Sequence, residues 1–256
     1  MAIDRKPILE MTGISKSFGA VKAVQEVDLK LYHGEILGLV GDNAAGKSTL
    51  MKVLSGVHRP DKGIIRIEGK EVHIENPHQA RDLGIDMIYQ DFALAPNLSI
   101  ADNIFLGREE IQTFGVIRFL NRKKMHLEAE HALESTNIRI DSVKTTVSQL
   151  SGGQMQAVAI ARATAFGAKI LVMDEPTASL SVKAIPQLLE LMVRLKNSGT
   201  PIIFITHRLQ DIFSVCDRVM VLRRGECAGV SDIKDTNMDE VTSLITGAKE
   251  SFNSSS

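Results

Sequence analysis

Residues 41 to 49 read Gly-Asp-Asn-Ala-Ala-Gly-Lys-Ser-Thr, and this stretch decides the fold class of the chain. It matches the P-loop pattern, in which a glycine, four variable residues and a second glycine precede lysine and a hydroxyl residue. The buried-strand sequence Glu35 to Val40 comes before it, and an apparent helix follows as far as Leu54. A strand, a glycine-rich turn and a helix N-terminus in this order form a cradle for phosphate. The stretch therefore predicts an α/β fold that binds a nucleotide.

The residue types in this loop each suit one task. Backbone N–H groups wrap the α and β phosphates, Lys47 reaches the β and γ oxygens, and Ser48 ligates Mg²⁺. The predicted nucleotide-binding residues of the loop are Gly41, Asp42, Asn43, Ala44, Ala45, Gly46, Lys47, Ser48 and Thr49. Because kinases, GTPases and many ATPases share the pattern, it predicts ATP or GTP with Mg²⁺ but leaves the reaction open.

A second phosphate-binding element follows about one hundred residues later, where Leu150-Ser-Gly-Gly-Gln154 heads an apparent helix. Its glycines and its helix N-terminus suit an anion. One nucleotide already has a complete cradle in the P-loop. The economical interpretation is that Ser151, Gly152, Gly153 and Gln154 close the cradle of another subunit.

Two carboxylates end the apolar run Ile170-Leu-Val-Met-Asp-Glu. At the carboxyl end of a buried strand they would lie where ligands collect in α/β sheets. Asp174 would hold Mg²⁺ through water, and Glu175 would accept a proton from the attacking water. Gln90 and His207, each at an apparent strand end, are candidates to position the γ-phosphate and the water. Taken alone, such a glutamine is usually a surface residue and such a histidine a structural hydrogen-bonding group.

The P-loop, Gln90, residues 150 to 154, the carboxylate pair and His207 occur in the order and spacing of an ABC ATPase. Over about residues 7 to 247 the chain resembles this family of nucleotide-binding subunits of ATP-driven membrane transporters. The resemblance implies a RecA-like P-loop NTPase core, an antiparallel β subdomain and an inserted helical subdomain. It also implies that Phe18 stacks on adenine, that Gln90 faces the membrane subunits and contacts Mg²⁺, and that His207 senses the γ-phosphate.

The same resemblance implies the partners. In that family two subunits dock head to tail, so that each ATP lies between one P-loop and the other subunit's signature, which suits a homodimer. Residues 103 to 109, Asn-Ile-Phe-Leu-Gly-Arg-Glu, look like the ATPases of bacterial monosaccharide importers, and the single cassette resembles their fructose-type branch. Permease subunits and, indirectly, a periplasmic sugar-binding protein would follow. One alternative is the same ATPase driving the transport of a non-sugar substrate or driving an exporter. The other is a soluble ABC ATPase acting on ribosomes or DNA.

Composition limits the function classes. The 256 residues carry 30 basic and 31 acidic side chains, a net charge of −1, which gives no general attraction to nucleic acid. Two cysteines suit a reducing compartment, and no apolar run is long enough to span a bilayer. Together with the family resemblance, which implies membrane partners, these features lead us to expect a peripheral protein on the cytoplasmic face of the bacterial inner membrane.

The chain is expected to form one ABC domain over residues 1 to 250, with the helical subdomain at about 91 to 150 and a disordered tail at 251 to 256. Strand signals disappear inside the insertion, where Ser99 and Asn121 are expected to cap helices.

Two residues depart from the family pattern. Ala44 replaces the usual glycine, which is tolerable if φ stays negative there or if a modest strain is accepted. Ser181 replaces the usual aspartate after the carboxylate pair, which puts in doubt the contacts between the two ATP sites.

Overall fold

The computed structural model describes residues 6–89, 93–114, 116–134, 136, 138–178 and 180–252. The chain forms two compact units. The first consists of Met1–Met87, Lys169–Glu175 and Met192–Ser256, and the second consists of Ile88–Ala168 and Pro176–Leu191. Gln90 and the tail residues 253 to 256 lie outside the described residues.

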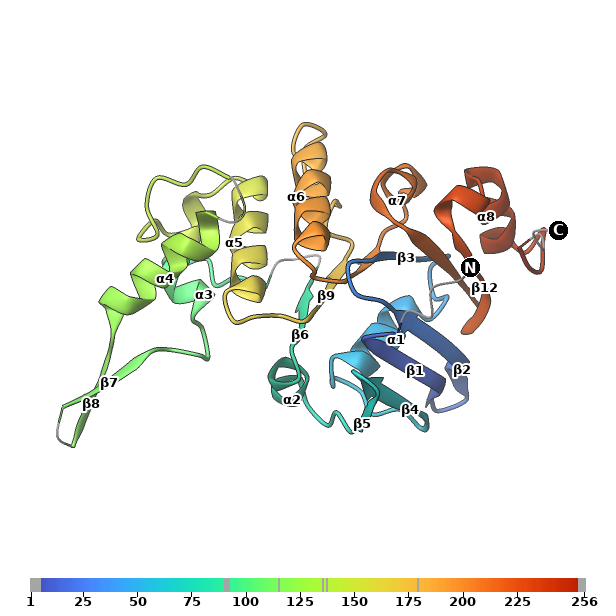
Figure 1. The fold of residues 1–256 in the computed structure, drawn as a ribbon, viewed down its shortest axis with the longest axis horizontal. Coiled ribbons are helices and arrows are strands. Elements are labelled where there is room, and N and C mark those ends of the chain that lie inside the picture. The colour runs from blue at the N-terminus through green and yellow to red at the C-terminus, as the bar shows by residue number, and fades with distance from the viewer. Residues whose placement is uncertain are drawn as a thin grey trace. The chain divides into compact units, whose positions relative to one another are not determined.

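The first unit is built around a six-stranded sheet in the order β12-β11-β3-β10-β9-β6 (Figure 1). Its strands are β3 (Ile36–Gly41), β6 (Ile85–Ile88), β9 (Ile170–Asp174), β10 (Ile202–Ile205), β11 (Arg218–Arg223) and β12 (Glu226–Asp232). The central strands β9, β10, β3 and β11 pair in parallel, and only β12 is shown to pair antiparallel. The parallel strands are apolar almost throughout because both faces of such a sheet are covered. Their carboxyl ends therefore meet at one edge.

A second, antiparallel sheet in the same unit has the order β2-β1-β4-β5. Its strands are β1 (Leu9–Phe18), β2 (Val21–Leu31), β4 (Lys62–Ile67) and β5 (Lys70–Val72). Alternate residues of β1 and β2 are buried, as expected for a sheet with one face on the core. Strands β4 and β5 form a hairpin, with Gly69 at φ 78° in its turn.

The helices of the first unit are short. They are α1 (Lys47–Leu54), α2 (Pro77–Asp82), α7 (Leu209–Val215) and α8 (Met238–Thr246). Helix α1 ends at Leu54 as predicted, and Gly56 beyond it has φ 73°. A Cβ on Gly56 would lie 2.5 Å from the Asn76 carbonyl oxygen, so only glycine fits there.

The second unit has its own apolar core. Its elements are α3 (Ile100–Ile104), α4 (Arg122–Glu134), α5 (Gly152–Thr164) and the hairpin strands β7 (Ile111–Phe114) and β8 (Ile117–Leu120), while α6 (Ile185–Asn197) begins in it. The core is formed by α3, α4, α5 and the segment before α5, with Phe105, Met125, Ala129 and Val158 almost fully buried. As predicted, Ser99 accepts a hydrogen bond from Asp102 N at 3.1 Å and Asn121 accepts one from Lys124 N at 3.1 Å. The expectation that this region lacks strands is wrong, because β7 and β8 pair within it.

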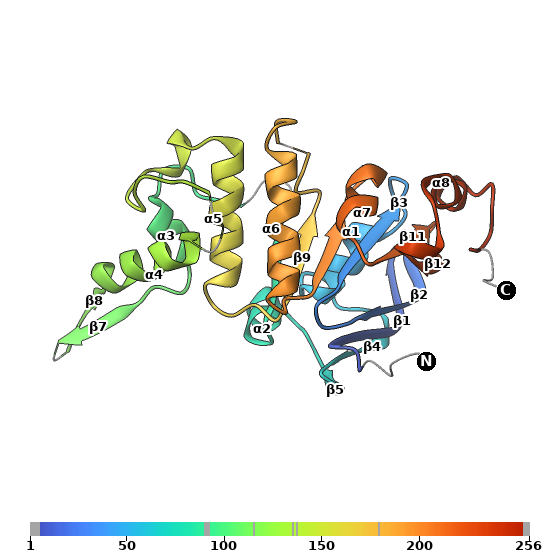
Figure 2. The same ribbon diagram turned by 45° about the horizontal axis from the view of Figure 1, so that its top comes forward.

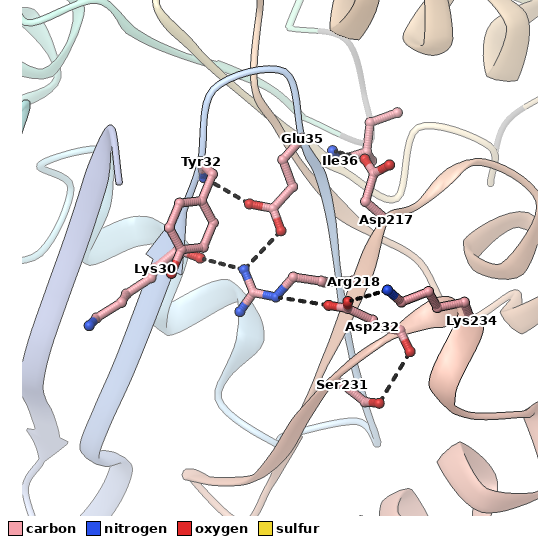
Figure 3. A network of polar contacts seen from close by, with 9 residues as sticks. All are labelled: Lys30, Tyr32, Glu35, Ile36, Asp217, Arg218, Ser231, Asp232 and Lys234. Atoms are coloured by element: carbon pink, nitrogen blue, oxygen red, sulfur yellow. Dashed lines mark hydrogen bonds and ion pairs between the residues drawn. The ribbon is translucent and has the colours of Figure 1, made fainter. Parts of the chain in front are cut away.

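One polar network joins the start of β3 to the start of β11 (Figure 3). The almost fully buried carboxylate of Glu35 accepts hydrogen bonds from Arg218 Nη1 at 2.8 Å and Tyr32 N at 2.7 Å. The Arg218 guanidinium also lies over the Tyr32 ring, 5.2 Å from its centroid. Burial raises the pKa of Glu35, and the positive charge of Arg218 opposes that rise. The network thus fixes the register of two parallel strands whose far ends carry the site.

Candidate nucleotide site

The P-loop connects β3 to α1, and its two glycines are required by close backbone contacts. Gly41 has φ 155° and Gly46 has φ 102°. A Cβ would lie 2.2 Å from the Leu222 carbonyl oxygen at Gly41 and 2.5 Å from the Ala23 carbonyl oxygen at Gly46. Gly46 is the N-cap of α1 and supplies no side chain to the first helical N–H groups. These N–H groups are therefore available to an anion.

Lys47 folds back across this loop. Its Nζ donates hydrogen bonds to the carbonyl oxygens of Gly41 at 2.7 Å and Asp42 at 3.0 Å. Burial lowers the pKa of Lys47, while the nearby carboxylates of Glu175 and Asp174 raise it. The ammonium group is thus held inside the loop and is electrostatically coupled to both carboxylates.

Of the two backbone conformations considered for Ala44, a negative φ or a modestly strained one, the structure shows the strained one. Its φ is 64°, in the left-handed region that glycine adopts without strain, and its side chain is exposed. Ala45 beside it is buried and keeps an ordinary φ. The loop therefore keeps a glycine-like path at Ala44 despite the methyl group.

The two carboxylates follow β9 as predicted. Asp174 is the last residue of the strand, and burial, followed by the charge of Glu175, raises its pKa, while Lys47 and Lys52 lower it. Glu175 has left the strand and holds φ at 52°, with its N–H donated to the Ile205 carbonyl oxygen at 2.9 Å. This left-handed turn separates the directions of two consecutive carboxylates.

His207 lies beside Glu175. Because Ile205 pairs with Asp174 in the neighbouring strand, the residues after both strands come together at the same edge of the sheet. The Nδ1 atom of His207 is 2.8 Å from Oε2 of Glu175, and the histidine side chain is 70% exposed while that of the glutamate is 20% exposed. When Glu175 is ionised, Nδ1 carries the hydrogen of this contact and Nε2 faces outward as the free ring nitrogen.

Phe18 ends β1 with 45% of its surface exposed. One neighbour is the His58 ring, edge to face at a centroid distance of 5.0 Å, and another is Lys16, whose Nζ lies over the Phe18 ring at 5.7 Å. Lys16 is itself held by Asp61 at 2.8 Å. The contact between His58 and Phe18 is not visible in the sequence, because only the fold brings residue 58 to residue 18.

The predicted signature begins α5 in the second unit. Ser151 is the N-cap, and it forms a capping box with Gln154, whose Oε1 accepts from Ser151 N at 3.0 Å. The Gln154 amide also donates to the Arg139 carbonyl oxygen at 3.3 Å. The exposed Ser151 and the glycines Gly152 and Gly153 thus form a rigid helix N-terminus that faces solvent in a single copy.

Gln90, a candidate for both catalysis and Mg²⁺ binding, falls outside the described residues. Within the part of the chain that the structure describes, no three histidine, cysteine or acidic side chains gather closely enough to hold a metal ion. A P-loop Mg²⁺ does not require such a cluster, because it is bound by one or two carboxylates and by the phosphates themselves. Ser48 is exposed at the start of α1 and Asp174 ends β9, so the residues present fit a nucleotide-bound Mg²⁺.

Comparisons with known proteins now give the family. The sequence model described as "ABC transporter" matches residues 24–178. This chain belongs to the ABC transporter family. It is an ABC ATPase, and ATP binding and hydrolysis are the activity of its family.

Several curated relatives of this ABC ATPase carry names of sugar importers. The "Xylose/arabinose import ATP-binding protein XylG" of Sulfolobus acidocaldarius is 47% identical over 239 residues, covering 93% of this chain and 94% of the relative. The "Fructose import ATP-binding protein FrcA" of Rhizobium meliloti is 44% identical over 251 residues, covering 96% of each chain. The "Ribose import ATP-binding protein RbsA" of Caldanaerobacter subterraneus is 44% identical over 249 residues, but only 49% of it is matched. The ABC ATPase thus spans about half the length of the ribose relatives.

Solved cassettes confirm the predicted fold class. The ADP conformation of MJ1267, an ATP-binding cassette of an ABC transporter, has a TM-score of 0.78 at 24% identity, covering 96% of this chain and 97% of that one. A P-loop NTPase fold with parallel and antiparallel sheets and added helices is therefore correct. None of the helices formed by the described residues is both long and apolar enough to cross a bilayer.

Proposed function

We propose that this chain is the ATP-hydrolysing subunit of a membrane importer for a monosaccharide such as fructose or ribose. The observation that carries the proposal is the full-length similarity to a fructose import ATP-binding protein, at 44% identity over 96% of both chains. Since no residue of an ATP-hydrolysing subunit needs to touch the sugar, the choice of sugar rests on the relatives alone. The assignment of ATP hydrolysis rests on the geometry of the P-loop and on the contact between Glu175 and His207.

In the proposed site the P-loop residues 41 to 49 bind the phosphates of ATP and Phe18 stacks on adenine. Lys47 is held by two loop carbonyls, so it neutralises phosphate charge without a long rearrangement. Ser48, Asp174 and Gln90 would hold Mg²⁺. Held there, Mg²⁺ would offset the negative charge that develops on the phosphate oxygens.

Glu175 is the proposed general base of hydrolysis. Its carboxylate accepts a proton from a water that attacks the γ-phosphorus, the phosphoryl group moves to the water oxygen, and ADP leaves with the electron pair of the broken bond. His207 holds one carboxylate oxygen through Nδ1, which leaves the other oxygen for the water. A γ-phosphate oxygen would accept a hydrogen bond from Nε2 when that nitrogen also carries a hydrogen. The left-handed backbone at Glu175 supports this role, because strained residues gather at functional sites.

The proposed assembly is a head-to-tail homodimer. Each P-loop meets Ser151, Gly152, Gly153 and Gln154 of the second copy, so ATP closes the dimer and hydrolysis reopens it. Residues 1 to 250 act as one ABC domain, with a helical subdomain at about 91 to 150, on the cytoplasmic face of the bacterial inner membrane. There the dimer drives two permease subunits, which take sugar from a periplasmic binding protein.

Reconstitution tests this function. The chain is purified with its permease in proteoliposomes, and uptake of labelled fructose, ribose and xylose is measured with ATP inside or outside, alongside ATPase activity. We expect uptake of one monosaccharide that requires ATP on the side of this subunit and is lost in Glu175→Gln. ATP hydrolysis coupled to export, or to a substrate that is not a sugar, would overturn the import assignment. Co-purification with nucleic acid instead of a permease would overturn the membrane role.

A further inference from the structure

The hairpin β7–β8 in the second unit carries the largest group of exposed apolar side chains in the described chain. Val116 is 99% exposed, Phe119 57%, Ile117 55%, Ile111 46% and Leu120 45%. Figures 1 and 2 both show the hairpin extending away from α3 and α4 as a narrow two-stranded ribbon. Exposed apolar side chains gathered in this way mark a contact with a membrane or another protein.

The apolar residues lie on both faces of the ribbon. The register pairs Ile111 with Leu120, and the next pair along the ribbon places Phe119 opposite Gln112. Since successive residues of a strand point to opposite faces, Ile111 and Leu120 share one face while Phe119 and Ile117 share the other. A flat protein partner would cover one face and leave the other in water. A surrounding apolar medium would cover both.

The charged residues of the hairpin and of the first residues after it are all basic. Residues 111 to 123 include Arg118, Arg122 and Lys123 and contain no acidic residue, in a chain whose net charge is −1. The nearest acidic residue before them, Glu110, is paired with Lys124 at 2.9 Å. Arg122 contacts Asp102 at 3.7 Å but is still 63% exposed, so that it can also reach an anionic surface. Exposed apolar groups beside exposed cations suit the headgroup region of an anionic bilayer.

Backbone chemistry limits how deep the ribbon can go. A two-stranded ribbon has unpaired N–H and C=O groups along both outer edges, and these groups cannot enter the hydrocarbon core. The tip can therefore reach only the boundary between headgroups and acyl chains, where water and phosphate still satisfy the edges.

We propose that the β7–β8 hairpin is an anionic-lipid contact that places Val116, Ile117 and Phe119 in the headgroup boundary and Arg118, Arg122 and Lys123 against lipid phosphates. The contact would orient the subunit at the membrane independently of the permease. It goes beyond the proposed transport function, because it needs neither ATP nor sugar.

The chain has no tryptophan, so one introduced at the tip is a unique fluorescent probe. Val116→Trp is mixed with permease-free vesicles of phosphatidylcholine, or of equal parts phosphatidylcholine and phosphatidylglycerol. Val182→Trp is the matched control, because Val182 is also a highly exposed valine, at 81%, and lies outside the hairpin. We expect a blue shift and quenching by brominated acyl chains for the Val116 probe with anionic vesicles alone, and neither change for the Val182 probe.

Two further variants separate the contributions of charge and apolar surface. Arg118→Gln combined with Arg122→Gln and Lys123→Gln should weaken partitioning into anionic vesicles at least about tenfold, as expected for three surface cations. Ile117→Ser combined with Phe119→Ser should weaken it as well, while Val182→Ser should not. ATPase activity should be unchanged in all of them, which also shows that the variants fold.

Three outcomes would overturn the lipid contact. The first is no fluorescence shift of the Val116 probe with anionic vesicles, and the second is an equal shift for both probes. The third is a shift that appears only with phosphatidylcholine vesicles that contain the permease. The last outcome would make the hairpin a protein contact. Because vesicle binding and sugar uptake are measured separately, loss of one leaves the conclusion about the other intact.

Discussion

The Nδ1 atom of His207 lies 2.8 Å from Oε2 of Glu175, and Glu175 holds this contact from a left-handed backbone with φ 52°. A non-glycine residue pays about 1 kcal/mol or more for such a φ, so the surrounding structure must fix it. The bond from Glu175 N to the Ile205 carbonyl oxygen supplies one such restraint. The carboxylate is therefore oriented before any substrate arrives, and the side chain of His207 beside it is 70% exposed.

Replacing Glu175 by Gln tests the role of this carboxylate. The amide keeps the size of the side chain and its oxygen still accepts from His207 Nδ1, but it cannot take a proton. We expect turnover to fall by about 10²- to 10⁴-fold while ATP affinity is retained, and ATP should trap a closed dimer. ATPase rates, nucleotide binding and size-exclusion chromatography with ATP measure the three quantities. Near-normal hydrolysis would remove Glu175 from the role of base.

How much of this site is visible in the sequence depends on how local each part is. The P-loop, the caps at Ser99 and Asn121 and the strand before Asp174 are local patterns, and the structure contains all of them. The contact between His207 and Glu175 depends on β9 and β10 being neighbours, which no local pattern states. The contact of His58 with Phe18 depends in the same way on the path of the chain after α1.

The β7–β8 hairpin was missed for a different reason. Its strands have four residues each, and apolar residues fall on both faces, so neither shows the alternation that marks a half-buried strand. The left-handed φ of Ala44 was one of two possibilities that the sequence left open. The strain at this alanine can be recognised only once its backbone angle φ is known.

Replacing Ala44 by Gly should relieve the strain in the P-loop. Ala248→Gly is the matched control, because Ala248 is also exposed and lies outside the helices and strands, while only Ala44 has a positive φ. We expect the free energy of unfolding of Ala44→Gly to exceed that of Ala248→Gly by about 1–2 kcal/mol. Chemical denaturation without nucleotide measures the difference. Equal stabilities would mean that the loop does not hold Ala44 in a strained conformation in solution.

Replacing Glu35 by Gln should change how stability depends on pH. The folded pKa of Glu35 is raised above its ordinary value of 4.5, so the folded chain keeps this proton more tightly than the unfolded chain. As pH rises from 4.5 through the raised pKa, this residue therefore makes the free energy of unfolding of the wild type fall. The Gln variant lacks that contribution, so its stability relative to wild type should increase across the same window.

Denaturation curves of the wild type and of Glu35→Gln at several pH values test this expectation. A relative stability of Glu35→Gln that stays constant or falls as pH rises would contradict a raised pKa.

The His58 ring should contribute to binding of the adenine base but not to binding of the phosphates. If Phe18 is the platform for the base, loss of the His58 ring frees Phe18 to rotate, and an aromatic pair of this kind contributes about 0.5–1.5 kcal/mol. His58→Ala should therefore raise the KM for ATP by about 2- to 10-fold with kcat unchanged, and His58→Phe should restore it. Inhibition by tripolyphosphate, which has no base, should be the same in all three proteins.

Phe18→Ala separates the two possible failures. If Phe18→Ala raises the KM for ATP and His58→Ala does not, Phe18 binds the base without help from His58. If neither change affects the KM, the adenine platform lies elsewhere in the chain.

Mixing two inactive variants tests whether Ser151 serves the P-loop of the other copy. Ser151→Arg places a bulky cation at the N-terminus of α5, which should spare ATP binding by monomers and block ATP-dependent dimerisation and hydrolysis. Lys47→Ala should weaken phosphate binding in its own P-loop.

In a head-to-tail heterodimer of the two variants, each P-loop meets the opposite signature, so both lesions fall in one site and the other site is intact. We expect hydrolysis in the mixture above that of either variant alone, with heterodimers confirmed by affinity tags of two kinds. A model in which each signature serves its own P-loop gives one lesion in every site and no recovery. A dimer of one wild-type copy and one copy carrying both changes is the reverse control, because the head-to-tail arrangement then leaves one lesion in each site. Hydrolysis in this control dimer but not in the mixture of single variants would therefore argue against the head-to-tail arrangement.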